Sequence, residues 1–195
     1  MRKAAVIAAA VTGVVLLGGS IVFVRMIRHG FSAHDEPTVL EAFMARRMRH
    51  LAVPSAARDV RNPVPASDGV LAAGRAHFAD HCATCHGNDG KGQTQIGRNL
   101  YPKAPDMSAR GTQSLSDGEL YYIIKNGVRL TGMPAWETGT AEGDQQSWHL
   151  VHFIRHLPMI SEDELREMEK LNPRSPDELA EEETERRFLH GEDVP

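Results

Sequence analysis

The stretch Cys82-Ala83-Thr84-Cys85-His86 decides how this chain is interpreted. It contains both cysteines of the 195 residues, and its order is Cys-x-x-Cys-His. In that order, two thiols can add to the two vinyl groups of a haem while the next histidine binds the iron. The stretch therefore predicts one haem c, bound covalently through Cys82 and Cys85, with His86 as an axial ligand.

Three other kinds of site use a pair of cysteines at this spacing. A thioredoxin-like dithiol belongs beside alternating strands and helices, and no runs of β-branched residues predict strands here. A structural zinc site needs four ligands, whereas this chain has one cysteine pair. A lone disulfide outside the cytoplasm stays open as an alternative, but it would not require His86. Haem attachment alone uses every residue of the motif.

Composition favours one small domain with extensions. Aromatic residues make up 6% of the chain, and 17 glycines with 11 prolines indicate many loops. Residues 1–66 carry nine Lys and Arg against four Asp and Glu, whereas residues 161–195 carry five against thirteen. A basic start and an acidic end fit a chain that lies near a membrane. Nothing in the sequence resembles a nucleic-acid-binding surface.

An uncharged apolar run of 21 residues extends from Ala4 to Val24. As a helix it would be about 31 Å long, which is enough for the hydrocarbon core of a bilayer. A cleaved signal peptide is the alternative, but its apolar region is usually about 7–15 residues and ends in an Ala-x-Ala-like site. We therefore predict an uncleaved transmembrane anchor over residues 1–28. The arginines that follow leave its orientation undecided.

Residues 29–66 are predicted to form a juxtamembrane helix and a linker. Thr38 and Glu41 match a capping box, and an amphipathic helix is expected over 37–51. Its apolar residues recur at helical spacing and its arginines lie elsewhere: Leu40, Phe43, Met44, Met48 and Leu51, with Arg46, Arg47 and Arg49. Two interpretations stay open, namely packing on the domain that follows or resting on anionic lipid headgroups. Three prolines then predict an irregular linker over 52–66.

Residues 67–158 are predicted to be the haem-binding domain. A helix is expected from Ser67 into the attachment motif, a second opens at a capping box that begins with Ser116, and a third is stopped by Pro158. The intervening chain is mostly loop. Residues 159–195 are predicted to be an acidic C-terminal extension of short capped helices.

A second iron ligand is expected from a methionine in a loop. Most of the eight methionines fall in predicted helices, in the membrane span or in the acidic tail, which leaves Met107 and Met133. Met133 lies between Gly132 and Pro134, so its backbone can approach a flat ring closely. It also follows a capped helix that can hold it in place. We therefore predict Met133 as the iron ligand opposite His86, with Met107 as the weaker rival.

The pattern resembles the class I c-type cytochromes, in particular small monohaem bacterial proteins with an N-terminal anchor. Three stretches carry the resemblance: Gly74–Gly87, Gly97–Leu100 and Asn126–Trp136. It covers about residues 67–158 and implies an all-α fold wrapped around one covalent haem. It also implies that Gly74 and Phe78 of the first helix meet the last helix, near Trp148.

One departure from the family pattern concerns the support of His86. Many members have Gly-Pro-Asn-Leu, with the proline carbonyl bonded to the proximal histidine, whereas this chain has Gly97-Arg98-Asn99-Leu100. The resemblance implies that the carbonyl of Arg98 accepts this bond without the fixed φ of proline. Four side chains are candidate donors to the haem propionates: Arg98, Tyr101, Arg129 and Trp136.

Three histidines of the last predicted helix, His149, His152 and His156, flank its apolar face. A second metal site for copper or zinc would use such residues. An ordinary polar helix face is the alternative. The same choice applies to His77 and His81.

The sequence predicts an electron carrier and not an enzyme, because histidine and methionine would fill both axial positions of the iron. We expect a single-pass, membrane-anchored monohaem cytochrome c that transfers single electrons between donor and acceptor redox proteins. Covalent c-type haem is made on the outer side of the inner (cytoplasmic) membrane, so the haem domain should face the periplasm. The alternative is a haem-containing subunit or sensor of a larger redox complex.

Overall fold

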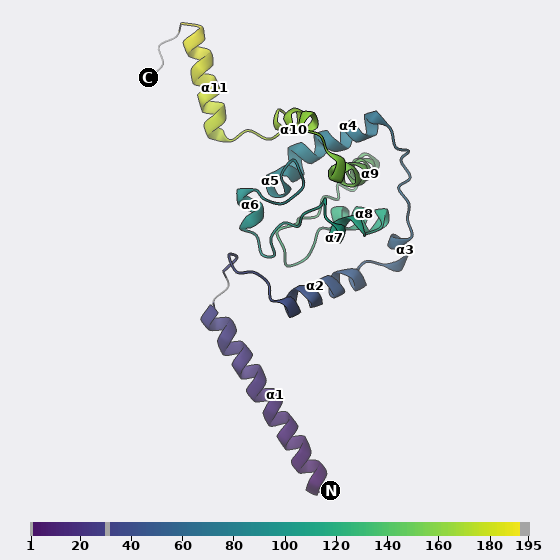
Figure 1. Cartoon of the computed structure of the whole chain (residues 1–195), viewed down its shortest axis with the longest axis vertical. Coiled ribbons are helices and arrows are strands. Elements are labelled where there is room, and N and C mark those ends of the chain that lie inside the picture. Colours follow the sequence, from purple (N-terminus) through teal and green to yellow (C-terminus); the bar gives the residue numbers. More distant parts are fainter. Residues whose placement is uncertain (1, 30–31, 192–195) are drawn as a thin grey trace. The chain divides into compact units, whose positions relative to one another are not determined.

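The structure is a computed structural model that describes residues 2–29 and 32–191. Within those residues every regular element is helical (Figure 1), which confirms the predicted all-α fold. The chain divides into two compact units, Met1–Glu36 and Pro37–Pro195. Each unit is described by itself.

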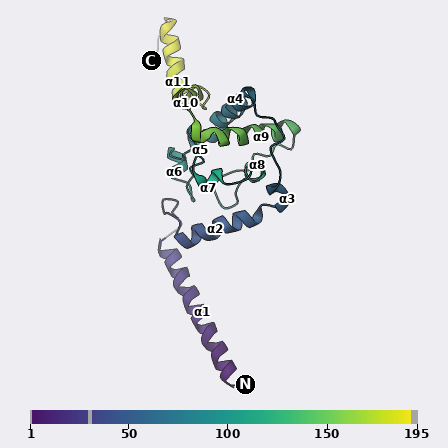
Figure 2. The same cartoon turned by 45° about the vertical axis from the view of Figure 1, so that its right-hand side comes forward.

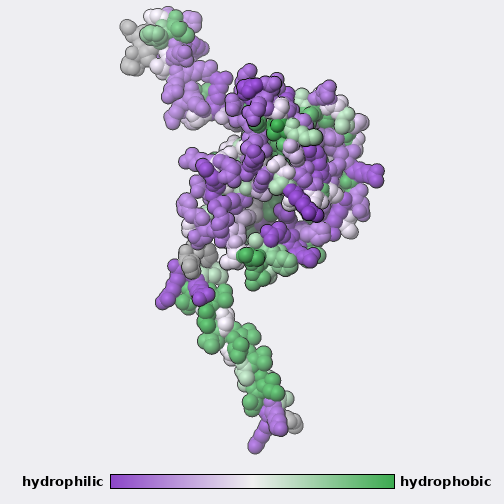
Figure 3. Space-filling view, viewed as in Figure 1, coloured by the Kyte–Doolittle hydropathy of each residue, from purple (hydrophilic) through white to green (hydrophobic). Residues whose placement is uncertain are grey.

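The first unit contains one long helix, α1 (Arg2–His29). Large apolar side chains are exposed along it from Val6 to Ile27, and Figure 3 shows it as a largely hydrophobic rod. Residues Arg2–Arg28 are long and apolar enough to cross a membrane. The predicted anchor thus corresponds to a single unbroken helix.

The second unit contains the remaining helices, most of the longer ones opening at a Ser or Thr N-cap. In chain order they are α2 (Val39–Ala52), α3 (Ser55–Arg58), α4 (Asp68–His77), the π-helical turn η1 (Phe78–Cys82), α5 (Ala83–His86), α6 (Gln95–Arg98), α7 (Arg110–Gln113), α8 (Asp117–Asn126), α9 (Ala141–His156), the 3-10 turn η2 (Leu157–Met159), α10 (Glu162–Glu169) and α11 (Pro176–Leu189). Reciprocal capping boxes open α8, α10 and α11 at Ser116, Ser161 and Ser175, as predicted.

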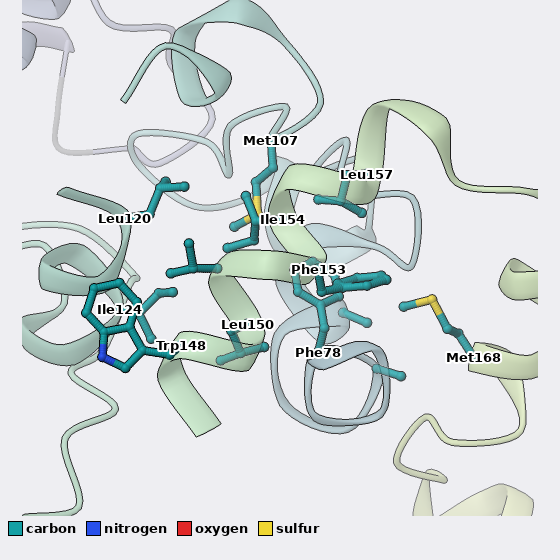
Figure 4. Close-up of a cluster of buried hydrophobic side chains, with 13 residues drawn as sticks. Phe78, Met107, Leu120, Ile124, Trp148, Leu150, Phe153, Ile154, Leu157 and Met168 are labelled. Atoms are coloured by element: carbon teal, nitrogen blue, oxygen red, sulfur yellow. The ribbon is translucent and has the colours of Figure 1, made fainter. Parts of the chain in front are cut away.

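The core forms where α4 crosses α9 (Figures 1 and 2). A Cβ on Gly74 would lie 2.3 Å from the carbonyl oxygen of His149, so only glycine permits this approach. One turn further on, Phe78 and Phe153 are fully buried with ring centroids 5.0 Å apart (Figure 4). The predicted contact of small and aromatic residues between the first and last helices of the domain is confirmed.

On the N-terminal side, the segment between α2 and α4 packs on the domain. Gly118 of α8 lies so close to α3 that a Cβ there would be 1.8 Å from the carbonyl oxygen of Ala57. Asn62 Nδ2 donates to the carbonyl oxygen of Trp148 at 3.0 Å. The predicted linker, 52–66, is therefore held against α8 and α9 by specific contacts.

On the C-terminal side, α10 adds to the core. Met168 is fully buried at the edge of the apolar cluster (Figure 4). Arg75 of α4 pairs with Glu164 at 3.4 Å and with Glu167 at 2.8 Å. The domain boundaries at 67–158 stay a prediction, but packing continues past both of them.

Candidate haem site

A π-helical turn carries the attachment motif away from α4. The sequence alone predicts one continuous helix into the motif, but the helix widens over Phe78–Cys82 before α5 begins. This wider turn keeps Phe78 and Ala79 buried and brings Cys82 against the core. π turns inside helices are frequently found at functional sites, because they reorient the residues that follow.

The two cysteines are free thiols. Burial, with a smaller contribution from the neighbouring Cys85, raises the pKa of the Cys82 thiol to about 12. Within the described residues no group of three or more His, Cys, Asp or Glu is placed to hold a metal ion, so a zinc site at these cysteines would lack its further ligands.

His86 is buried, with only 7% of its surface exposed. Burial lowers the pKa of its imidazole, and the backbone carbonyl of Pro105 partly offsets this effect. No hydrogen bond within 3.5 Å reaches its buried Nδ1 among the described residues. A buried imidazole with a backbone carbonyl near one nitrogen leaves the other nitrogen for a metal.

The carbonyl that acts on His86 thus belongs to Pro105, and the prediction of Arg98 is wrong. Arg98 is the last residue of α6, which instead packs under the motif through Gly97. The chain then turns back, and Met107 N donates to the carbonyl oxygen of Gly90 at 2.8 Å. The stretch Ala104-Pro105-Asp106-Met107 thus supplies a proline carbonyl from a position seven residues after Arg98. A proline followed by Asp and an apolar residue was the signal that sequence reasoning missed.

The loop over residues 127–136 presents Met133. Gly127 ends α8 with φ 66°, and a Cβ there would lie 2.6 Å from the carbonyl carbon of Pro134. Thr131 Oγ1 donates to the carbonyl oxygen of Val128 at 2.7 Å and accepts from Met133 N at 3.1 Å. Val128 N in turn donates to the carbonyl oxygen of Met133 at 3.1 Å. The backbone of Met133 is held from both sides while its side chain is half-buried.

Two contacts bring this loop to the rest of the site. The Trp136 ring meets the edge of His81, the residue before Cys82, with centroids 5.4 Å apart. The methyl groups of Leu100 lie next to Gly132, where a Cβ would be 2.6 Å from Leu100 Cδ2. The Met133 loop therefore lies beside both the attachment motif and the stretch that follows α6. Thr131 and Leu100 are positioning residues that sequence reasoning did not single out.

Met107 has a different environment. It is 9% exposed, belongs to the buried apolar cluster, and lies near Ile154 and Leu120 in Figure 4. Gln113 Nε2 donates to its carbonyl oxygen at 2.8 Å. A thioether that packs among apolar side chains serves as core. This placement favours Met133 over Met107 as the second ligand.

The histidines of α9 have separate surroundings. His152 Nε2 lies 2.8 Å from the carbonyl oxygen of Val64, and His156 Nε2 lies 2.9 Å from Glu164 Oε1. Burial lowers the pKa of His149, and its Nε2 has no hydrogen-bond partner in the described chain. Across residues 2–29 and 32–191, no group of three or more His, Cys, Asp or Glu is placed to hold a metal ion.

Of the candidate propionate donors, the Tyr101 hydroxyl donates to Glu41 Oε1 at 2.5 Å.

Comparison with known proteins now identifies the domain. Residues 69–154 match the protein family described as cytochrome c oxidase, cbb3-type, subunit III. These residues are a cytochrome c domain. The resemblance to c-type cytochromes is confirmed. The family implies haem c, and Cys82 and Cys85 match its Cys-x-x-Cys-His motif.

Two curated relatives are named as cbb3-type cytochrome c oxidase subunits. FixPc of Rhizobium leguminosarum bv. viciae is 36% identical over 93 residues, which are 48% of this chain and 30% of the relative. FixP of Rhizobium etli is 38% identical over 95 residues, again 48% of this chain and 30% of the relative. The chain thus matches about a third of the length of these relatives.

One solved structure, the reducing HAO-like protein complex of Kuenenia stuttgartiensis, contains a chain of 20% identity and TM-score 0.42. The match covers 50% of this chain and 49% of that one. This likeness is too weak to bear on fold or function.

Proposed function

We propose that this protein is a membrane-anchored cytochrome c subunit that passes single electrons within a larger membrane-bound redox complex. The match of residues 69–154 to an oxidase-subunit family carries the proposal. Both curated relatives are subunits of a cbb3-type oxidase. These findings favour the alternative drawn from the sequence, a subunit of a complex, over a free-standing shuttle.

The residues of the site fit one covalent haem. Two thiols on one helical segment would form the thioether bonds, and His86 would bind the iron from its buried position. Met133 would supply the sulfur on the opposite side from a loop whose backbone is fixed by Thr131. When bound, the haem supplies a one-electron couple at its iron, with methionine ligation raising the potential.

The chain's own residues would tether, orient and shield this group. The apolar cluster of α4, α8 and α9 excludes water from behind the motif (Figure 4). Pro105 lies against the imidazole of His86 and helps to orient it. His86 and Met133 would together hold the iron, and such a pair suits electron transfer. The haem domain would face the outer side of the membrane, where c-type haem is attached.

The axial ligands are tested by the visible spectra of three purified haem-loaded proteins. Met133→Ala should lose the methionine–iron charge-transfer band, because its side chain has no sulfur to offer. Met107→Leu is the matched control and should keep the band, since leucine conserves the volume of a core side chain. A band that persists in Met133→Ala would contradict the ligand assignment. Absence of covalent haem on a denaturing gel would contradict the haem site altogether.

A second measurement tests whether the protein is a subunit of a larger redox complex. Purification of the tagged full chain in mild detergent should bring down oxidase-type subunits in fixed proportion. A monodisperse single chain that still exchanges electrons with a soluble cytochrome would instead support the free-standing shuttle. Rapid carbon monoxide binding by the reduced protein would indicate a sensor, because it requires an open axial position.

A further inference from the structure

Helix α2 leaves an apolar stripe that no other part of the second unit covers. None of its 14 residues, all of them described, is buried. Four large apolar side chains along it are 67%, 52%, 66% and 76% exposed: Leu40, Met44, Met48 and Leu51. Figure 3 shows hydrophobic atoms gathered along the part of the second unit where Figure 1 places α2.

The stripe is on the opposite side of α2 from the domain. At about 100° per residue, Met44, Met48 and Leu51 all lie within about 80° of Leu40 around the helix axis. The residues that face the domain lie about 180–220° away from Leu40 on the same wheel. They are the partly buried Ala42 and Arg49 and the buried Val53.

Polar contacts fix this orientation. The Tyr101 hydroxyl donates to Glu41 Oε1 at 2.5 Å near the start of α2. His50 Nδ1 lies 3.3 Å from Glu119 Oε1 near its end, and Arg58 donates to the carbonyl oxygens of His50 and Val53. The helix is therefore clamped to the domain at both ends, and it cannot turn its stripe inward without breaking these contacts.

The arginines of α2 and its closeness in sequence to α1 indicate that a membrane surface covers the stripe. Three arginines, Arg46, Arg47 and Arg49, accompany one acidic residue in α2. On the same wheel Arg46 and Arg49 lie about 120° and 180° from Leu40. Arg47 lies about 20° from Leu40, beside the stripe, and its guanidinium is 5.7 Å from the centroid of the Phe43 ring. Arg47 can extend its guanidinium to anionic headgroups while the apolar side chains around it enter the headgroup–acyl boundary. Nine residues separate α1 from α2, so α2 follows the candidate membrane span closely along the chain.

We propose that α2 lies in the interface of an anionic bilayer, with its Leu40–Met44–Met48–Leu51 stripe in the headgroup–acyl boundary. This proposal rests on the membrane anchoring proposed above, but not on the haem or on electron transfer. Because α2 is clamped to Tyr101 and Glu119, its docking would fix the rotation of the haem domain relative to the membrane plane. The same surface of the domain would then always face a redox partner.

Thiol accessibility in the haem-loaded full chain tests this proposal. The native cysteines are thioethers in that form, so Met48→Cys provides the single reactive thiol. The chain is placed in nanodiscs that contain phosphatidylglycerol, and the rate of modification by a charged, water-soluble maleimide is followed by mass spectrometry. Leu179→Cys is the matched control, because Leu179 is an exposed apolar residue of another helix, α11.

The thiol at 48 should react several-fold more slowly than the thiol at 179 in these nanodiscs. Adding Leu40→Gln and Met44→Gln should restore the rate at 48, whereas adding Ala45→Gln, off the stripe, should not. In purely zwitterionic nanodiscs the protection should weaken, because the arginines lose their anionic partners.

Three results would overturn the proposal. Equal rates at 48 and 179 would show that the stripe stays in water. Protection at 48 that appears only when a purified oxidase complex is added would assign the stripe to a protein. Equal protection in both lipids would show that α2 does not require anionic headgroups. A chain that fails to enter nanodiscs would contradict the anchor itself, which separates that failure from the failure of α2.

Discussion

Residues 87–107, which are loop apart from the short helix α6, and the loop over residues 127–136 both lie beside the haem motif, yet they hold their methionines in different ways. In each segment a threonine hydroxyl bridges a carbonyl oxygen and an amide: Thr94 bonds Cys85 and Gly97, and Thr131 bonds Val128 and Met133. In the first segment the methionine side chain is buried in the core. In the second the backbone is fixed and the side chain stays half-buried.

This difference separates two roles for one residue type. The sulfur of Met107 has apolar neighbours from α8 and α9 (Figure 4), so its contribution is packing. The backbone of Met133 is held by hydrogen bonds, and its sulfur stays available as the proposed iron ligand opposite His86. The first segment supplies the carbonyl that acts on His86, through Pro105, and the second supplies the proposed sulfur ligand.

The largest effect that separates the two segments is expected from Met107→Ala. Removing a buried methionine side chain should cost about 2–5 kcal/mol of stability, because the cavity only partly collapses. The methionine–iron band of the folded fraction should persist. Denaturant unfolding followed by circular dichroism gives the free energy, and the visible spectrum gives the ligand. If Met107→Ala lost the band while remaining folded, the roles of the two methionines would have to be exchanged.

A smaller contrast is expected between two glycines, one in each segment. A Cβ at Gly97 would lie 2.1 Å from the backbone carbonyl oxygen of Cys85, so Gly97→Ala must displace main chain beneath the motif. We expect it to cost about 1–3 kcal/mol and to lower the yield of covalent haem. A Cβ at Gly132 would meet only the flexible end of Leu100, so Gly132→Ala should cost about 1 kcal/mol.

Thermal unfolding and haem yield, measured side by side for the two glycine variants, check this contrast. Equal losses would mean that the Met133 loop is as tightly packed as the turn beneath Cys85. That result would contradict the view that packing holds residues 87–107 whereas hydrogen bonds hold residues 127–136.

Local sequence signals predicted much of this site. The attachment motif and the capping boxes at Ser116, Ser161 and Ser175 depend on residues within one or two helical turns. The crossing of α4 with α9 at Gly74 joins distant residues, and it was expected from the resemblance to c-type cytochromes. These features correspond closely to what the structure contains.

Features that depend on the path of a long segment were not predictable in the same way. The carbonyl that reaches His86 comes from Pro105, after a turn that returns the chain to Gly90. Met168 is one apolar residue in an acidic helix, yet it is fully buried, because the ion pairs of Arg75 hold α10 on the domain. Neither the Pro105 carbonyl near His86 nor the burial of Met168 could be inferred from the spacing of residues in the sequence, since each depends on how a long segment of chain folds back.

The smallest and most specific effect is expected from the two bridging threonines. Thr131→Val keeps the shape of the side chain but removes its bonds to Val128 and to Met133 N. It should cost about 1 kcal/mol and loosen the loop that presents the sulfur. External imidazole should then displace the methionine from the ferric protein several-fold faster, as followed by stopped-flow spectroscopy.

Thr94→Val is the matched control for that experiment. It removes the corresponding bonds to Cys85 and Gly97 at a similar cost of about 1 kcal/mol. His86, however, would be held by its burial and by the proposed thioether bonds of Cys82 and Cys85 beside it, so the rate of imidazole binding should stay at the wild-type value. An equal acceleration in both variants would mean that ligand loss follows general loosening of the domain. An acceleration in Thr131→Val alone would show that the hydrogen-bonded loop controls the iron–sulfur bond.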